Sequence, residues 1–367
     1  MRVLSVFGTR PEAIKMAPIV LRLAQMPEVE ARVCVTAQHR QMLDQVLDLF
    51  QIRPHYDLNL MQEDQSLGEL AAAILTHLEP VLAEFQPDWV LVQGDTTTVA
   101  ITALLAYYHR LRVGHVEAGL RTHDKWQPFP EEINRRIAGV IADLHFAPTE
   151  WAQQNLLREG VPEKDILITG NPVIDALHYV AAQPIPPETA DLLERAKGRR
   201  LILVTAHRRE NFGTPLQNIC RALQRLAARG DLFLIYPVHL NPNVQSVVRR
   251  ELEGVENILL LPPLEYLPLV HLMRHATLIL TDSGGIQEEA PAFGVPVLVL
   301  RNVTERPEGV EAGVLKLVGT ETENILREAE HLLEDAQAYQ AMARAANPFG
   351  DGRAAERIVQ ALLERGR

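Results

Sequence analysis

The stretch MRVLSVFGTRPEAIKMAP, residues 1–18, indicates the fold of the whole chain. Its apolar run, 3–7, ends at Gly8, and the cations Arg10 and Lys15 follow where the pattern becomes helical. In an α/β protein the carboxyl end of the first strand faces a ligand. The stretch lacks the glycine pattern of a dinucleotide site and the Lys-Ser/Thr pair of a phosphate loop. A ligand at this edge would therefore be contacted by one glycine, one arginine and one lysine.

The same alternation of short apolar runs with amphipathic helical stretches continues along the chain. Strands are predicted within residues 2–7, 31–37, 89–94, 112–118, 144–148, 165–170, 201–207, 232–238, 258–263, 277–283 and 296–301. Near-continuous apolar strands joined by helical crossovers are typical of parallel sheets that are covered on both faces. The chain is therefore expected to have an α/β fold.

The alternation pauses at residues 169–172 and in the proline-rich segment 181–189, and it restarts at Arg200. Together with the length of 367 residues, this pattern predicts two domains. We expect two Rossmann-like doubly wound domains, 1–169 and 170–352. A final helix, 353–367, is expected to pack back on the first domain.

The composition excludes several classes of protein. The formal net charge of −11 argues against a broad nucleic-acid surface. No charged-then-apolar leader precedes Arg2, and no apolar run approaches the about 20 residues of a spanning helix. Cys34 and Cys220 lie in apolar contexts without a CxxC motif, which is typical of the reducing cytoplasm. We therefore expect a soluble cytoplasmic protein with neither nucleic acid nor membrane as a partner.

Metal and cofactor motifs are missing as well. The histidines are scattered without the spacing of metal ligands, and no nicotinamide or flavin fingerprint is present. If the chain is an enzyme, its chemistry is expected to use side chains alone, without a metal or a cofactor.

Polar residues gather at the predicted carboxyl ends of the strands. The stretches concerned are GTRPEAIK (8–15), AQHRQ (37–41), QGDTTT (93–98), VEAGLRT (116–122), AHRREN (206–211), PVHLNP (237–242) and DSGGIQEEA (282–290). Doubly wound folds place ligands at this edge of the sheet. These stretches are therefore the candidate binding and catalytic segments.

The stretch DSGGIQEEA predicts a nucleotide site. After Ser283, Gly284 and Gly285 allow close approach to the free backbone N–H groups of a helix start, which suits a diphosphate. Glu288 and Glu289 lie one turn into that helix and suit the vicinal diol of a ribose. The alternative is a plain serine cap with acidic residues in the first turn. We favour the nucleotide interpretation.

The stretch AHRREN offers both an acid/base group and phosphate donors. A histidine can titrate near neutrality, which makes His207 a candidate acid or base, and Arg208 and Arg209 carry planar donors for a phosphate. A histidine after a strand is more often a hydrogen-bonded structural residue, but adjacent arginines in an acidic protein favour function. His239, at the end of the next strand, has the same interpretation with less support.

Three carboxylates complete the set. Asp95 and Glu117 each follow an apolar strand in a glycine-bearing turn, where a buried charge needs a partner or a function. Glu131 starts a helix after Pro130, and Arg135 lies four residues later on the same face. Arg135 is expected to hold the Glu131 carboxylate or to bind substrate. The alternatives are a helix cap by Asp95 and surface salt bridges within EEINRR.

These motifs, with GHVEAGLRT, PFPEEINRR and RPEGVEAG, resemble the non-hydrolysing UDP-N-acetylglucosamine 2-epimerases of bacteria from Arg2 to about Gly352. The resemblance implies a GT-B-type fold with the active site in a cleft, a homodimer, and reversible conversion of UDP-GlcNAc to UDP-ManNAc for cell-envelope polysaccharides. It assigns Asp95, Glu117, Glu131 and His207 to catalysis and Lys15 and Arg135 to further active-site positions. It matches Arg10, His239, Ser283, Gly284 and Glu288 to UDP contacts, to which the strand-end pattern adds Arg208 and Gly285.

The chemistry of this reaction fits the residues. The C2 hydrogen of the sugar is not acidic, and oxidation would need a nicotinamide site that the sequence lacks. Anti elimination of UDP to 2-acetamidoglucal, followed by re-addition, needs acid/base groups on two faces of C2. We expect Asp95 on one face, Glu117 and Glu131 on the other, and His207 near the departing UDP oxygen.

One stretch departs from the family. Many members carry a regulatory UDP-GlcNAc site that uses glutamines, here Gln38 and Gln41, and an arginine a short way downstream. Asp64 stands where that arginine is expected. A carboxylate in place of a phosphate-binding cation predicts weaker or absent allosteric activation.

Three other functions remain open. A GT-B glycosyltransferase would bind the same nucleotide sugar but leave the C2 hydrogen in place. A hydrolysing epimerase would release free ManNAc and UDP. A catalytically idle nucleotide-sugar sensor would not need the four catalytic candidates together.

Overall fold

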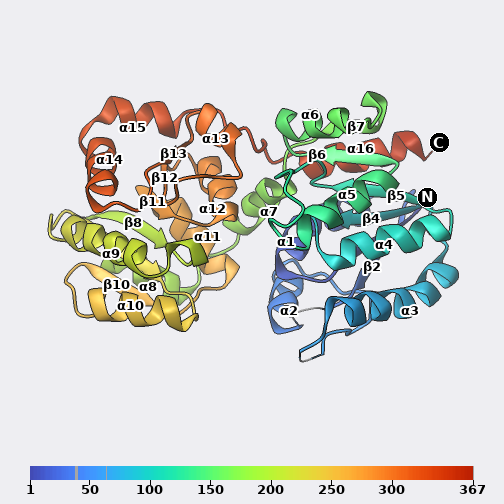
Figure 1. Cartoon of the computed structure of the whole chain (residues 1–367), viewed down its shortest axis with the longest axis horizontal. Coiled ribbons are helices and arrows are strands. Elements are labelled where there is room, and N and C mark those ends of the chain that lie inside the picture. Colours follow the sequence, from blue (N-terminus) through green and yellow to red (C-terminus); the bar gives the residue numbers. More distant parts are fainter. Residues whose placement is uncertain (38–39, 63, 367) are drawn as a thin grey trace. The chain divides into compact units, whose positions relative to one another are not determined.

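The computed structural model describes residues 1–37, 40–62 and 64–366. The chain forms two compact units. Unit 1 comprises Met1–Tyr179 and Phe349–Arg367, and unit 2 comprises Val180–Pro348. Figure 1 shows each unit as a sheet flanked by helices.

Within the described residues, unit 1 contains a seven-stranded sheet in the order β3-β2-β1-β4-β5-β6-β7. Its strands are β1 (Arg2–Phe7), β2 (Glu30–Val35), β3 (Tyr56–Asp57), β4 (Trp89–Gln93), β5 (Arg112–Val116), β6 (Leu144–Ala147) and β7 (Ile166–Ile168). Every neighbouring pair is parallel. The strand order reverses between β1 and β4, so a ligand site is expected at the carboxyl ends of these two strands.

The helices of unit 1 cover its sheet. They are α1 (Arg10–Ala24), α2 (Arg40–Leu49), α3 (Leu67–Phe85), α4 (Thr97–Tyr108), α5 (Glu131–Ile141), α6 (Glu150–Arg158), α7 (Pro172–Ala181) and α16 (Ala354–Arg365). Apolar side chains of α3, α4 and α5 share one buried core with β1, β4 and β5. On α16, the N–H groups of Ala354 and Ala355 donate to Asp175, at 3.1 and 2.9 Å, which fastens this last helix to α7.

Unit 2 repeats the arrangement with a six-stranded parallel sheet, counted over its described residues, in the order β10-β9-β8-β11-β12-β13. The strands are β8 (Arg200–Thr205), β9 (Leu232–Pro237), β10 (Ile258–Leu261), β11 (Leu278–Thr281), β12 (Val297–Val299) and β13 (Leu315–Leu317). The helices are α8 (Pro187–Arg195), α9 (Thr214–Ala227), α10 (Pro242–Leu252), α11 (Tyr266–His275), α12 (Gly284–Glu289), α13 (Pro307–Glu311), α14 (Thr322–Glu334) and α15 (Ala336–Ala343). The order reverses between β8 and β11.

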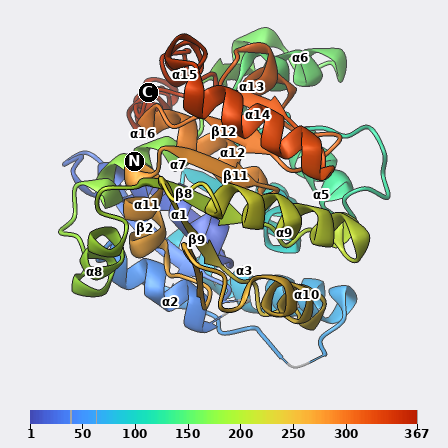
Figure 2. The same ribbon diagram turned by 90° about the vertical axis from the view of Figure 1, so that its left-hand side faces the viewer.

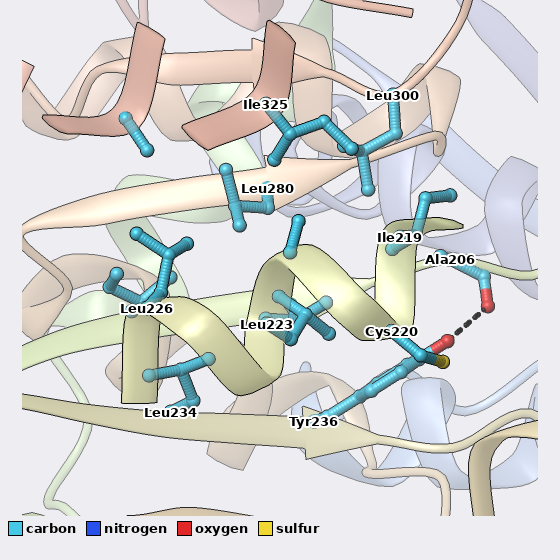
Figure 3. Close-up of a cluster of buried hydrophobic side chains, with 14 of the residues drawn as sticks. Ala206, Ile219, Cys220, Leu223, Leu226, Leu234, Tyr236, Leu280, Leu300 and Ile325 are labelled. Atoms are coloured by element: carbon cyan, nitrogen blue, oxygen red, sulfur yellow. Dashed lines mark hydrogen bonds between the residues drawn. The ribbon is translucent and has the colours of Figure 1, made fainter. Parts of the chain in front are cut away.

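The core of unit 2 lies between its sheet and α9, α10 and α14, which gather on one side of the strands in Figure 2. Leu223 and Leu226 of α9 pack there against Leu234 and Leu280 of the sheet (Figure 3). Tyr236 of β9 is fully buried in this core, and its hydroxyl donates to the backbone carbonyl of Ala206 at 2.7 Å. The core thus anchors the backbone directly before His207.

The predicted fold class is confirmed, since both sheets are parallel and doubly wound in the Rossmann order. Every apolar run that was predicted as a strand contains one. The prediction missed β3 and β13, because each is short and contains a charged residue, as YD and LKL, and so does not form an apolar run.

The domain borders at 169 and 352 stay predictions. The border between the units falls within α7, and the chain returns to unit 1 at Phe349. Gly170 approaches this returning segment so closely that a Cβ on it would lie 3.1 Å from the Cα of Gly350. Over the described residues, no helix is long and apolar enough to cross a membrane.

Candidate functional site

The turn between β1 and α1 is closely packed. A Cβ on Gly8 would lie 2.0 Å from Oγ1 of Thr36, so only glycine fits there. Glu12 forms a capping box with Thr9, and its Oε2 accepts from the N–H groups of Gly8 and Thr9 at 2.8 and 2.7 Å. Its Oε1 accepts from the hydroxyl of Thr96 at 2.5 Å. Glu12 thus ties the end of β1 to the end of β4, a function that the sequence analysis missed.

Burial raises the pKa of the Glu12 carboxyl above its ordinary value, against the opposing effect of these hydrogen bonds. Arg10 is the first residue of α1 and is partly exposed. Arg10 is therefore accessible to a ligand at this edge of the sheet.

Glu117 lies directly after β5 in a left-handed conformation, with φ of 61°. Its side chain is 5% exposed. Oε1 accepts from Lys15 Nζ at 2.6 Å and from Asn171 Nδ2 at 2.9 Å. Oε2 accepts from the amide of Gln93. The structure therefore brings together two predicted residues, Lys15 and Glu117, and adds two amides that the sequence analysis did not identify.

Asp95, after β4, pairs with a different cation. Arg135 Nη2 lies 2.5 Å from Asp95 Oδ2, and Arg135 Nη1 lies 3.5 Å from Glu132 Oε2. Of the two expected functions of Arg135, no described contact supports the pairing with Glu131, because on α5 the guanidinium extends toward the end of β4 and pairs with Asp95. Substrate binding by Arg135 stays a prediction. The helix cap of α4 is Thr96 rather than Asp95, so the Asp95 carboxylate is not used as a cap.

Glu131 begins α5 after the N-cap residue Pro130. Its Oε2 is buried and accepts no hydrogen bond from any described residue. The neighbouring Glu132 is fully buried and accepts from the N–H groups of Thr122 and His123, at 3.1 and 3.3 Å, which holds the preceding loop on α5. Glu131 therefore has one buried oxygen left for a ligand or a proton.

In unit 2, Asp282 organises the loop after β8. Asp282 is fully buried, and its Oδ2 accepts from the N–H groups of His207 and Arg208, both at 2.8 Å, and from Asn211 Nδ2 at 2.9 Å. A carboxylate at the end of β11 thereby fixes the backbone at the end of β8. Both strands flank the point where the strand order reverses.

His207 is positioned by two neighbours. Its Nδ1 lies 3.5 Å from Asp282 Oδ1, and its ring stacks on that of His239 with 5.1 Å between centroids. Burial lowers the pKa of His207, while the charge of Asp282 opposes this effect. The two predicted histidines thus lie together, and the neutral form of His207 is favoured.

Arginine side chains converge on the start of α12. A Cβ on Gly284 would lie 3.4 Å from Nη2 of Arg208 and 3.9 Å from Nη2 of Arg306. Gly285 is exposed, and Ser283 is partly exposed. Two guanidinium groups beside a glycine turn form a suitable environment for an anionic group such as a diphosphate.

Glu288 is buried and forms an ion pair with Nε of Arg306. Arg306 belongs to the stretch RPEGVEAG, which contributed to the resemblance without being assigned a function. This ion pair could not be predicted from the sequence, because the distance between Arg306 and Glu288 depends on the fold.

The predicted regulatory residues are placed only in part. Gln38 and the side chain of Gln41 lie outside the described residues. Asp64 is exposed, with φ of 55°. In the described part of the chain, no group of three or more His, Cys, Asp or Glu side chains has the arrangement of a metal site.

Comparisons with known proteins identify relatives of this chain. A family model described as UDP-N-acetylglucosamine 2-epimerase matches residues 21–363. The UDP-N-acetylglucosamine 2-epimerase of Salmonella typhimurium is 56% identical over 369 residues, covering 99% of this chain and 98% of that protein. Its counterpart from Escherichia coli K12 is 57% identical with the same coverage.

Solved structures are similar over the whole chain. The UDP-GlcNAc 2-epimerase of Neisseria meningitidis bound to UDP-GlcNAc is 49% identical, with a TM-score of 0.90, and the match covers 99% of this chain and 100% of that one. A complex of Staphylococcus aureus MnaA with UDP is 47% identical, with a TM-score of 0.88, over 100% and 97% of the two chains.

Proposed function

Because the chain belongs to the UDP-N-acetylglucosamine 2-epimerase family, we propose that it interconverts UDP-GlcNAc and UDP-ManNAc at C2 without hydrolysis. An epimerase of this kind is an isomerase and supplies the synthesis of cell-envelope polysaccharides. The proposal needs a site for UDP and acid/base groups for C2, and each unit offers one of these two sets of residues.

The UDP set lies in unit 2. Arg208, with Gly284, Gly285 and Ser283, is the proposed diphosphate site, because a guanidinium and backbone N–H groups stabilise the charge of a leaving diphosphate. His239 stacks on His207 beside this site, and Glu288 follows one turn into α12. Arg10 of unit 1 is proposed as a further UDP contact.

The acid/base set lies in unit 1, and the observation that carries the proposal is that its three carboxylates have three different environments. Glu117 is paired with Lys15, Asp95 is paired with Arg135, and Glu131 keeps a buried oxygen without a partner among the described residues. Removal of the C2 proton on one face and its return on the other require more than one acid/base group, and three separately held carboxylates can provide them.

We propose anti elimination of UDP as the mechanism. One carboxylate removes the C2 proton while the C1–O bond to UDP breaks, which gives 2-acetamidoglucal. His207, whose neutral form is favoured, is proposed to act near the departing UDP oxygen. Protonation of C2 on the opposite face and re-addition of UDP complete the epimerisation.

Proton NMR of UDP-GlcNAc with the pure protein in deuterium oxide tests the function. The proposal expects UDP-ManNAc to appear with deuterium at C2. An unchanged C2 proton without UDP-ManNAc would overturn the proposal and favour a glycosyltransferase, whereas free ManNAc would indicate a hydrolysing epimerase. Asp95→Asn, Glu117→Gln and Glu131→Gln then sort the carboxylates by the face on which deuterium still enters.

We also propose a homodimer that acts in the cytoplasm. The packed helices α4 and α5 expose five large apolar or aromatic side chains, Tyr107, Tyr108, Ile133, Ile137 and Val140. Burial against a second copy would remove this surface from water. Light scattering is expected to give twice the mass of the chain, and Val140→Glu to give monomers; a wild-type monomer would contradict the proposal.

A further inference from the structure

Asn171 connects Glu117 to the place where the chain enters α7 and returns from unit 2. Its side chain is buried, and its Nδ2 donates to Glu117 Oε1 at 2.9 Å. Its Oδ1 accepts from the N–H of Val173 at 3.1 Å, at the start of α7. Its own N–H donates to the carbonyl of Phe349 at 2.7 Å. Asn171 therefore contacts three separate segments of the chain, through its amide nitrogen, its amide oxygen and its backbone N–H.

The amide of Asn171 belongs to a clamp of donors around Glu117. Lys15 comes from α1, Gln93 from β4, and Asn171 from the turn before α7. All three offer N–H groups to the Glu117 carboxylate, and an ammonium and an amide nitrogen have no lone pair for a protonated carboxyl to donate to. This arrangement matches an ionised Glu117.

The backbone explains why such a clamp is needed. Glu117 has φ of 61°, a left-handed conformation that is unfavourable for residues other than glycine. A strained turn persists only when surrounding contacts hold it. Glu117 is therefore held in its unusual conformation by contacts from elements distant in sequence.

We propose that Asn171, with Gln93, is a positioning residue for the epimerase reaction and keeps the Glu117 carboxylate ionised and oriented toward the sugar. This inference rests on the proposed function. An ionised carboxylate in a fixed orientation is the state in which a base accepts a proton from carbon. The same hydrogen bonds link that carboxylate to the segment that joins unit 1 to unit 2.

Asn171→Asp tests the donor specifically. The substitution retains the oxygen that accepts from Val173 N–H, but it places a second carboxylate oxygen against Glu117. We expect kcat at a pH of about 8 to fall roughly 10- to 100-fold, the effect of one lost hydrogen bond to a charged group. KM is expected to stay within about threefold, because the substrate contacts are intact.

The loss should depend on pH. Below a pH of about 6 the introduced carboxyl takes up a proton and donates to Glu117, because two adjacent carboxylates raise each other's pKa. The activity ratio of the variant to the wild type is therefore expected to rise as the pH falls. His115, on β5, is a titratable neighbour of Glu117, and burial lowers its pKa to about 3, so its charge does not change in this range. Lys15, on α1, forms the ion pair with Glu117.

Asn171→Ser is the matched control. Serine keeps an acceptor for the start of α7, but it is too short to reach Glu117 and introduces no charge. Its kcat is expected to fall by a factor that does not change with pH. If Asn171→Asp is active and its kcat has the same pH dependence as that of the wild type, the positioning function is overturned.

A second measurement does not depend on activity. Thermal unfolding at a pH of about 8 is compared for Asn171→Asp, Glu117→Gln and the double variant. We expect Asn171→Asp to lower Tm in the wild-type background and to lower it much less beside Glu117→Gln, whose amide can donate to the new carboxylate. If the Tm shifts of the two single variants add up to the shift of the double variant, the contact between Asn171 and Glu117 is overturned. If the wild type leaves UDP-GlcNAc unchanged, the proposed function fails, while this cycle still tests the clamp.

Discussion

Lys15 Nζ lies 2.6 Å from Glu117 Oε1, and the two residues are 102 positions apart in the sequence. Lys15 belongs to the second turn of α1, and Glu117 follows β5 on the other side of the strand order reversal. The pair is mostly buried, since the two side chains are 17% and 5% exposed. Its loss should therefore affect both folding and catalysis.

Lys15→Met is expected to lower the free energy of unfolding by about 3 kcal/mol, because it leaves a buried carboxylate without its cation. Urea titration at a pH of about 8 measures this change. In the Glu117→Gln background the same substitution should cost much less, since no charge is left unpaired. Equal costs in the two backgrounds would show that the pair does not contribute as its geometry implies.

Asp282→Ala should weaken UDP binding although Asp282 is not a proposed UDP contact. The substitution removes the acceptor of three donors at the end of β8, including the N–H groups of His207 and Arg208. We expect the free energy of unfolding to fall by about 3 kcal/mol or more. Calorimetric titration of the folded variant with UDP should give a higher Kd; an unchanged Kd would contradict the anchoring function of Asp282.

Glu12 predicts a pH dependence of stability. Burial raises the pKa of its carboxyl in the folded state above the ordinary value of 4.5, so the folded chain holds this proton over a range where the unfolded chain has lost it. The contribution to stability is thus complete below that value and is lost as the pH rises through the folded pKa. The amide of Glu12→Gln has no titrating proton, so the variant lacks this pH-dependent contribution to stability.

The stability of Glu12→Gln relative to the wild type is accordingly expected to increase as the pH rises from about 4.5 toward neutrality. Urea midpoints at intervals across this range provide the measurement. A constant difference between the two proteins at every pH would exclude the raised pKa.

Asp64 predicts weak regulation of the reverse reaction. From the resemblance, the regulatory UDP-GlcNAc site of many family members has an arginine at this place, and a carboxylate there repels a diphosphate. We expect UDP-ManNAc to be converted without added UDP-GlcNAc. A strict requirement for UDP-GlcNAc would count against this prediction.

The substitution Asp64→Arg is expected to increase activation by UDP-GlcNAc. Because Asp64 has φ of 55°, where asparagine and aspartate are better tolerated than arginine, the control is Asp64→Asn. The control removes the charge and keeps the backbone preference. Equal activation by the two variants would assign the effect to lost repulsion rather than to a new phosphate contact.

The residues at the edges of the sheets could be predicted from the sequence more reliably than the contacts of individual side chains. Glu117 and Asp95 were recognised because each follows an apolar strand, which is a local pattern. Gln93 and Asn171 lie in stretches that stand out in the sequence, QGDTTT and residues 169–172, but no local pattern indicates that either side chain contacts Glu117. Helical spacing offered Glu131 as one partner of Arg135, but Arg135 pairs with Asp95, which lies 40 residues away.

The amino-acid sequence by itself determined the two parallel doubly wound sheets, the family, and the set of strand ends that carry the polar residues. These features depend on local hydrophobic periodicity and on long motifs, and carboxyl ends of parallel strands meet at one edge whatever their order. Only the tertiary structure decided which cation neutralises which carboxylate, and that Glu117 is clamped by Lys15, Gln93 and Asn171. Such contacts depend on the order of the strands and on the packing of the crossover helices, and spacing along the chain does not encode these distances.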